Sequence, residues 1–103
     1  MDGEIRMRAR LDQGMATIQI LMPHPMETGL RVDERGSLVP AHHITDVRVT
    51  LDGRTVLSAQ MSFAMSRDPL LTFRVAGAAA GQRLRVVWKD SLGQTRDRES
   101  VIT

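Results

Sequence analysis

The stretch VRVTLDGRTVL, residues 47–57, decides the fold class of this chain. Val47, Val49 and Leu51 alternate with polar residues, and the side chains of a β-strand point alternately to its two faces. Asp52-Gly53 follows this alternation, and such a dipeptide between alternating segments is a strong short-range signal for a tight turn between antiparallel strands. The stretch therefore predicts a β-hairpin with one buried face.

The same period of two recurs along the rest of the chain. Further alternating segments begin at Ile5, Ala16, Leu71 and Leu84, and no window of useful length has the 3.6-residue period of a helix. The glycine-bracketed residues 76–81 are too short for a helix and are interpreted as a loop. These patterns predict an all-β chain, an immunoglobulin-like two-sheet antiparallel β-sandwich of about seven strands.

The length of the chain sets its expected organisation. Its 103 residues suit one domain, 1–103. We expect the arginine-bearing final segment, 94–102, to be an edge strand, because charged side chains discourage unwanted pairing at a sheet edge.

Composition excludes several classes of function. The chain has no cysteine, so it holds no disulfide, no thiol nucleophile and no cysteine-ligated metal. Fourteen basic residues against twelve acidic ones give a formal charge of +2, which is not the one-sided charge of a dedicated nucleic-acid binder. No apolar run reaches membrane-spanning length. Residues 1–4 lack the features of a secretory signal, which at face value predicts a cytoplasmic protein.

One stretch breaks the alternation, PHPMETGLRVDERGSLVPAHH at residues 23–43. It contains three prolines and two glycines, and all three histidines of the chain lie at its ends. Irregular loops of this length are uncommon in small domains and tend to be functional. This loop is therefore the candidate functional region.

The histidines raise the alternative of a small metal-binding β-sandwich. Imidazole is a common metal ligand, and closure of the loop would let His24 meet His42 or His43, with Glu27 or Asp33 as a further ligand. However, no HxH or HxxxH spacing prearranges these side chains. The competing structural interpretation is that His24 bonds the loop backbone and that the other two histidines lie on the surface.

Enzymatic and nucleic-acid functions have weaker support. Glu27 near His24, or Asp33-Glu34, could be drawn as an acid–base pair, but charged loop residues are usually solvated. No strand–turn–helix elbow presents a serine, so we predict no catalytic residue and no cofactor. Arginines alternate along several segments, but aromatic residues for base stacking are not interleaved with them. Phe73 and Trp88 lie on the apolar sides of their segments, so we expect them in the core. The alternating arginines are Arg6, Arg8, Arg10, Arg48, Arg74, Arg83 and Arg85. We expect them to be solvated, with neither nucleic acid nor membrane as a partner.

The irregular loop also carries a family resemblance. ILMPHPMETGLR at residues 20–31, then Asp33, Gly36 and VPAH at 39–42, resemble the SoxZ family pattern H-P-M-E-[ST]-G-x-R, D, G and I/V-P. The resemblance extends over residues 5–102, through matches at 52–57, 66–69 and 84–93. The chain departs from the pattern at three positions: Asp68 stands where Asn is usual, Leu70 where an aromatic is usual, and His43 where an apolar or aromatic residue is usual.

The resemblance implies a function that composition does not reveal. SoxZ proteins are non-catalytic, cofactor-free sandwich subunits that pair with a SoxY-type subunit, whose C-terminal cysteine carries covalent sulfur during thiosulfate oxidation. The heterodimer presents that cysteine arm to Sox cytochromes and to a sulfate-releasing hydrolase. The resemblance also implies a periplasmic location reached without a signal peptide of its own, by export together with the partner, in place of the cytoplasm.

The loop is then the expected partner-binding element. Met26 would supply an apolar anchor, and Glu27 and Arg31 would pair within the loop or across the interface. His24 would hold the loop or face the partner's C-terminal cysteine segment. The predicted partner-binding residues are His24, Pro25, Met26, Glu27, Thr28, Gly29, Arg31, Pro40 and His42.

Overall fold

The computed structural model describes residues 4–61 and 66–103. Within this part of the chain there are seven β-strands and no helix, and therefore no helix long and apolar enough to cross a membrane. The strands are β1 (Arg6–Asp12), β2 (Met15–Leu21), β3 (Ile44–Leu51), β4 (Arg54–Gln60), β5 (Leu70–Ala76), β6 (Arg83–Asp90) and β7 (Thr95–Val101).

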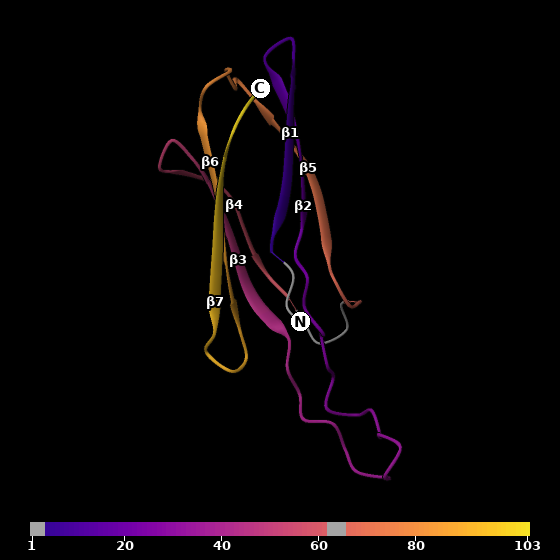
Figure 1. Ribbon diagram of the computed structural model, residues 1–103. Helices are drawn as coiled ribbons and strands as arrows, with labels where there is room; N and C mark the ends of the chain where they lie inside the picture. The colour runs from indigo at the N-terminus through magenta and orange to yellow at the C-terminus, as the bar shows by residue number, and fades with distance from the viewer. Residues whose placement is uncertain (1–3, 62–65) are drawn as a thin grey trace.

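The strands form two antiparallel sheets that pack face to face (Figure 1). One sheet has the order β1-β2-β5 and the other β4-β3-β6-β7. The predicted immunoglobulin-like β-sandwich is thereby confirmed. The prediction for the final segment is also confirmed, because β7 lies at the edge of its sheet.

Residues 47–57 form the hairpin of β3 and β4. Leu51 pairs with Arg54, so the turn consists of Asp52 and Gly53 alone. Both turn residues have positive φ angles, 48° and 81°, as a type I′ turn requires. This turn matches the natural right-handed twist of the strands that it joins.

The core comes from the apolar side of each alternation. The fully buried side chains include Ile18, Ile20, Val49, Leu84 and Val86, each of which contributes about 1.5–3 kcal/mol by its burial. Trp88 is buried with them, as predicted. Phe73, which was expected in the core, is only half-buried because β5 is an edge strand.

Residues 23–43, here called the arm, leave β2 and return to β3 at one end of the sandwich. The arm projects beyond the sheets (Figure 1), and it contributes to the elongated shape of the molecule, 53 × 21 × 20 Å. Its two sides are joined by single bridges, Glu27 to His42 and Val32 to Leu38. The arm is therefore a narrow ribbon and not a loose loop.

Candidate functional site

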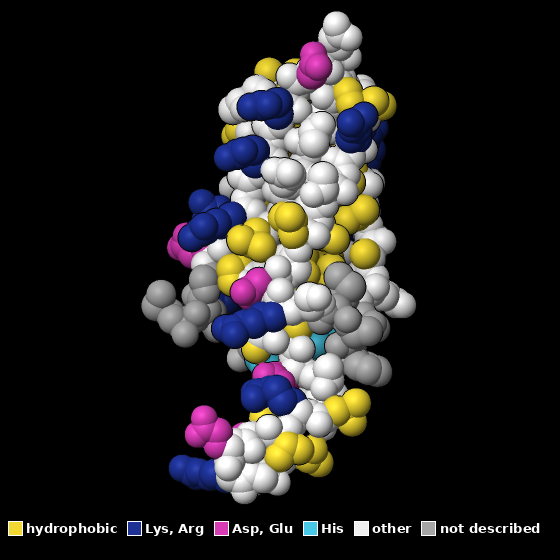
Figure 2. All heavy atoms as spheres, turned by 90° about the vertical axis from the view of Figure 1, so that its right-hand side faces the viewer, with side chains coloured by type: hydrophobic (Ala, Val, Ile, Leu, Met, Phe, Trp, Pro, Cys, Tyr) yellow, Lys and Arg dark blue, Asp and Glu magenta, His cyan; other side chains and the backbone are white. Residues whose placement is uncertain are grey.

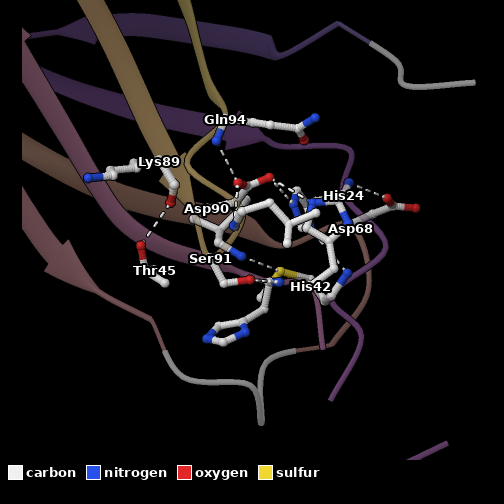
Figure 3. A network of polar contacts seen from close by, with 12 residues as sticks. His24, His42, Thr45, Asp68, Lys89, Asp90, Ser91 and Gln94 are labelled. Carbon is white, nitrogen blue, oxygen red and sulfur yellow. Dashed lines mark hydrogen bonds and ion pairs between the residues drawn. The ribbon is translucent and has the colours of Figure 1, made fainter. Parts of the chain in front are cut away.

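A buried carboxylate joins both ends of the arm to the four-stranded sheet. Asp90 is the last residue of β6, and its Oδ2 lies 3.2 Å from His24 Nε2 and 2.7 Å from His42 Nε2 (Figure 3). His24 stands near the start of the arm and His42 near its end. The two imidazole rings meet edge to face, with centroids 4.5 Å apart. We call His24, His42 and Asp90 the clasp.

The hydrogen bonds of the clasp define where its protons lie. Met26 N–H donates to His24 Nδ1 at 3.1 Å, so this nitrogen is an acceptor without a proton. The neutral imidazole then carries its proton on Nε2, which donates to the Asp90 carboxylate. An ionised carboxylate only accepts, so His42 Nε2 also donates to it.

The second oxygen of Asp90 closes the β6–β7 turn. Its Oδ1 accepts the backbone N–H groups of Leu92 at 3.1 Å and Gln94 at 2.9 Å. Burial of the carboxyl, which is 2% exposed, favours its neutral form. The hydrogen bonds from His42, His24, Gln94 and Leu92 outweigh this effect and hold the pKa of Asp90 below its ordinary value.

The backbone of His24 is fixed from the opposite side by Asp68. His24 N–H donates to Asp68 Oδ1 at 2.9 Å, and Asp68 N–H donates to the His24 carbonyl at 3.0 Å. Asp68 has a positive φ of 52°, a conformation that Asp and Asn tolerate better than most residues. Asp therefore serves at this position, where the family pattern has Asn. Trp88 packs edge to face against the His24 ring, with centroids 5.2 Å apart.

The metal-binding alternative is not favoured by this geometry. His24 and His42 do meet, and with Asp90 they place three ligand atoms within 4.8 Å of one another. A metal needs the Nε2 lone pair of His24, but that nitrogen carries a proton while Met26 N–H occupies Nδ1. Metal binding would thus break the bond from Met26.

The other candidate ligands lie outside the clasp. His43 uses its backbone N–H to donate to Ser91 Oγ at 3.1 Å. Asp33 Oδ1 accepts backbone N–H groups in the turn of the arm. Glu27 pairs with Arg31. The predicted backbone bond of His24 is confirmed, whereas His42 is not simply a surface residue, because it bonds buried Asp90.

The expectation that Met26 presents an apolar anchor needs correction. Its side chain is 5% exposed and belongs to the core, and its sulfur accepts the Ile44 N–H at 3.3 Å. Its φ of 50° turns the chain so that the side chain points inward from the arm. The sequence shows Met26 among polar residues, which hides this inward turn.

Glu27 and Arg31 form an ion pair within the arm, which is one of the two predicted possibilities. Arg31 Nη2 lies 2.8 Å from Glu27 Oε1, and Arg31 Nε donates to both carboxylate oxygens. The hydrogen bond from Arg31 lowers the pKa of Glu27, and the same bond raises the pKa of Arg31. The ion pair thus links two residues that lie four positions apart within the arm.

The remaining predicted residues shape the path of the arm. Thr28 Oγ1 accepts the Leu30 N–H at 3.0 Å. Gly29 has a φ of 86°, and a Cβ placed there would lie 3.1 Å from Ala41 Cβ, so the two sides of the arm approach closely at this point. Pro25 and Pro40 are exposed. An open hollow on the arm is lined by Pro25, Met26, Glu27, Thr28, Leu30, Arg31 and Arg67.

The tip of the arm exposes large apolar side chains. Leu30, Val32 and Leu38 are 76%, 55% and 65% exposed. They are held in place because Val39 N–H donates to the Arg31 carbonyl at 2.8 Å and Asp33 N–H to the Ser37 carbonyl at 2.9 Å. The tip is therefore a hydrogen-bonded apolar surface that the described residues leave exposed.

Sequence reasoning missed Asp90 as the centre of the site. The sequence Asp90-Ser91-Leu92-Gly93 predicts a turn, and that turn is present. No local signal shows that the second carboxylate oxygen faces two histidines, because those residues are 66 and 48 positions away in the chain.

Comparison with a family model identifies the chain over nearly its full length. The model described as "Sulphur oxidation protein SoxZ" matches residues 5–101. No curated protein sequence matches the chain significantly.

Solved structures of similar fold include a hypothetical protein, PH1083, from Pyrococcus horikoshii OT3. It is 13% identical with a TM-score of 0.70, and the match covers 99% of this chain and 89% of that one. A superoxide reductase in the oxidised state is 11% identical over the same shares, also with a TM-score of 0.70. The superoxide reductase from Nanoarchaeum equitans is 12% identical with a TM-score of 0.68, covering 98% and 93%. At these identities the likeness is one of fold alone.

Replacing Asp90 tests the clasp. Asp90→Asn removes the negative charge of a carboxylate whose two oxygens accept hydrogen bonds from four N–H groups. The amide NH2 group of Asn is a donor, so it would face some of these donors without an acceptor. We expect the free energy of unfolding at pH 7 to fall by about 3 kcal/mol, measured by urea denaturation with Trp88 fluorescence. Asp46→Asn is the control, because Asp46 is exposed and its carboxylate accepts a hydrogen bond from the neighbouring Thr45 hydroxyl. Equal losses in the two variants would contradict a special role for Asp90.

The stability difference between the wild type and Asp90→Asn should depend on pH. The folded pKa of Asp90 lies below its ordinary value, so the stability that its ionisation contributes is present above about pH 4 and is lost as the pH falls through the folded pKa. The difference in unfolding free energy between the wild type and Asp90→Asn should therefore shrink from pH 7 to pH 3. A difference that is constant over this range would contradict the assignment.

Replacing Met26 tests its burial. Met26→Asp places a carboxylate in the core, and we expect the isolated chain to lose at least about 3 kcal/mol of stability, measured by thermal and urea unfolding. Met15→Asp is the control because Met15 is exposed. If Met26→Asp is as stable as this control, the Met26 side chain is not buried in the core and is available to contact a partner.

Proposed function

Because the chain belongs to the SoxZ family, we propose that it is the non-catalytic subunit of a sulfur-carrier complex, in which it binds and stabilises a SoxY-type subunit. Family membership makes it a subunit of a sulfur-oxidation (Sox) system and implies partnership with SoxY. In the proposed complex the partner's C-terminal cysteine carries the covalent sulfur intermediates. This subunit helps to present that cysteine to the Sox cytochromes and to the sulfate-releasing hydrolase.

The exposed tip of the arm is the observation that carries the proposal. Three large apolar side chains, Leu30, Val32 and Leu38, are more than half exposed on one short ribbon. Neighbouring exposed apolar side chains are typical of protein–protein contacts. The clasp holds both ends of this ribbon to the sandwich, so a partner would meet a preformed surface, and less conformational entropy is lost on binding.

The hollow beside the tip extends the proposed contact. It contains Pro25, Glu27, Thr28 and Arg31, which are four of the residues predicted to bind the partner. Met26 also lines the hollow but is only 5% exposed, and His24 is likewise buried in the chain. Their proposed contribution is therefore to position the arm rather than to touch the partner.

The lack of a reactive group in the clasp supports a non-catalytic role. Asp90 is buried and its two oxygens accept four hydrogen bonds. His24 has both ring nitrogens engaged. The sequence contains no cysteine, so the sulfur-carrying thiol of the proposed complex belongs to the partner.

We further propose that the complex works in the periplasm and that this chain is exported together with its partner. The support is the family membership, since a carrier of thiosulfate-derived sulfur must meet the enzymes that load and unload it.

Charge at the arm tip tests the interface. In Leu30→Asp/Leu38→Asp the apolar tip gains two carboxylates that would have to be desolvated in the interface. We expect its affinity for the SoxY-type subunit to fall at least tenfold by isothermal titration calorimetry, with the melting temperature of the isolated chain unchanged. Leu92→Asp is the control, an exposed leucine outside the arm. Wild-type affinity in the double variant would refute the arm as the interface.

Cell fractionation tests the location. Expressed with a SoxY-type subunit that carries an export signal, the chain should appear in the periplasmic fraction, and it should stay in the cytoplasm when that signal is deleted from the partner. Export of the chain without any partner would contradict joint export.

A further inference from the structure

The outer face of the sheet β1-β2-β5 carries four arginines in an ordered array. The pairing registers define its rows as Arg6–Leu21–Leu70, then Arg8–Gln19–Thr72, then Arg10–Thr17–Arg74. Arg6, Arg8 and Arg10 alternate with inward-facing residues of β1, so their side chains share the outward side. We call Arg6, Arg8, Arg10 and Arg74 the arginine face.

The positive charge of this face is not neutralised by the chain. Within residues 4–61 and 66–103, none of the four arginines makes an ion pair or a side-chain hydrogen bond. The only acidic residue in the paired rows is Asp12, in the terminal row Asp12–Met15–Ala76. The strands of this sheet therefore carry four positive charges against one negative charge.

On the opposite sheet, positive and negative side chains lie next to one another. There, Arg85 pairs with Asp97 at 3.1 Å and approaches Glu99 at 4.0 Å. Asp46 lies directly across from Lys89 in the strand register. Charges on that face are thus interspersed, which is the usual pattern of a solvated sheet surface.

A hollow with both polar and apolar walls lies within the arginine face. It is lined by Arg6, Met7, Arg8, Gln19, Leu21 and Leu70, and Leu70 is 58% exposed. Figure 2 views the side of the molecule on which β5 lies in Figure 1, and it shows Lys and Arg side chains on both margins of the sandwich with hydrophobic side chains between them. Arginines around an apolar centre are a frequent composition of protein interfaces.

We propose that the outer face of β1-β2-β5 is a docking surface for a protein that presents clustered carboxylates around an apolar side chain. Guanidinium groups bind carboxylates with two parallel hydrogen bonds, and the hollow between Leu21 and Leu70 receives the apolar side chain. The described aromatic residues, Phe73 and Trp88, lie on the inward sides of their strands, so this face offers no stacking platform for nucleic-acid bases.

The physics of the surface suits a transient complex. The arginines are exposed, so each ion pair contributes little to affinity and is weakened by salt. A concentrated positive field accelerates encounter with an acidic protein. The surface lies on the sandwich and not on the arm, so the proposal does not depend on which partner the arm binds.

The test uses an acidic peptide of stated composition, a fluorescent Glu4-Leu-Glu4 nonapeptide, titrated into the full chain at low salt. We expect saturable binding that weakens steeply with added sodium chloride, with NMR amide shifts confined to β1, β2 and β5. Arg8→Gln/Arg10→Gln should lower the affinity at least tenfold. The control Arg48→Gln/Arg54→Gln removes the same charge from the opposite sheet and should change it less than twofold.

Three results would overturn the proposal. Equal losses in both double variants would show attraction by net charge alone. Tighter binding of a twelve-residue oligo-dT to the same strands would make the face a nucleic-acid surface. Tighter binding of phosphatidylglycerol vesicles than of the peptide would make it a membrane surface. Arg74→Gln, a single exposed change on an edge strand, repeats the measurement if the double variant fails to fold.

Discussion

The structure depends on one buried carboxylate. Asp90 is removed from water, yet it stays ionised because four N–H groups donate to its two oxygens. Two of these donors are the histidines at opposite ends of the arm, and two belong to the turn that follows β6. A buried charge with all its acceptors satisfied is tolerated, but the same charge with a missing donor is costly. The arm, the turn and the sheet are therefore held in one arrangement by a single side chain.

Sequence patterns predicted the sheets well because their causes are local. Alternation sets which side of each strand is buried, and Asp52-Gly53 adopts the positive φ angles that its turn requires. The clasp could be predicted only in part. The irregular composition of residues 23–43 and the histidines at its ends marked this loop as a candidate site. Asp90 lies far from the loop in the chain, and its local sequence predicts only a turn. Met26 was misplaced for a related reason, since its inward direction comes from a backbone angle that sequence does not display.

Similarity of fold separates from similarity of function in this molecule. Superoxide reductases share the sandwich at 11–12% identity, which is the level at which architecture is retained while sites diverge. The family match, by contrast, runs along nearly the whole chain, residues 5–101. The motif at residues 20–31 and 39–42 lies mostly in the stretch that departs from regular alternation, as functional segments of a fold often do.

The chain therefore uses its histidines and its buried carboxylate for structure and exposes leucines and arginines to solvent. Its clustered imidazoles and its buried carboxylate bond one another, whereas leucines and arginines face outward at the arm tip and on the sheet. These two surfaces differ in physical character. The apolar tip suits a lasting contact whose strength comes from burial, and the arginine face suits a brief one that is steered by charge. The proposed carrier subunit would stay with one partner and meet others briefly, and the sandwich keeps the two surfaces apart by placing one beyond the sheets and the other on a sheet face.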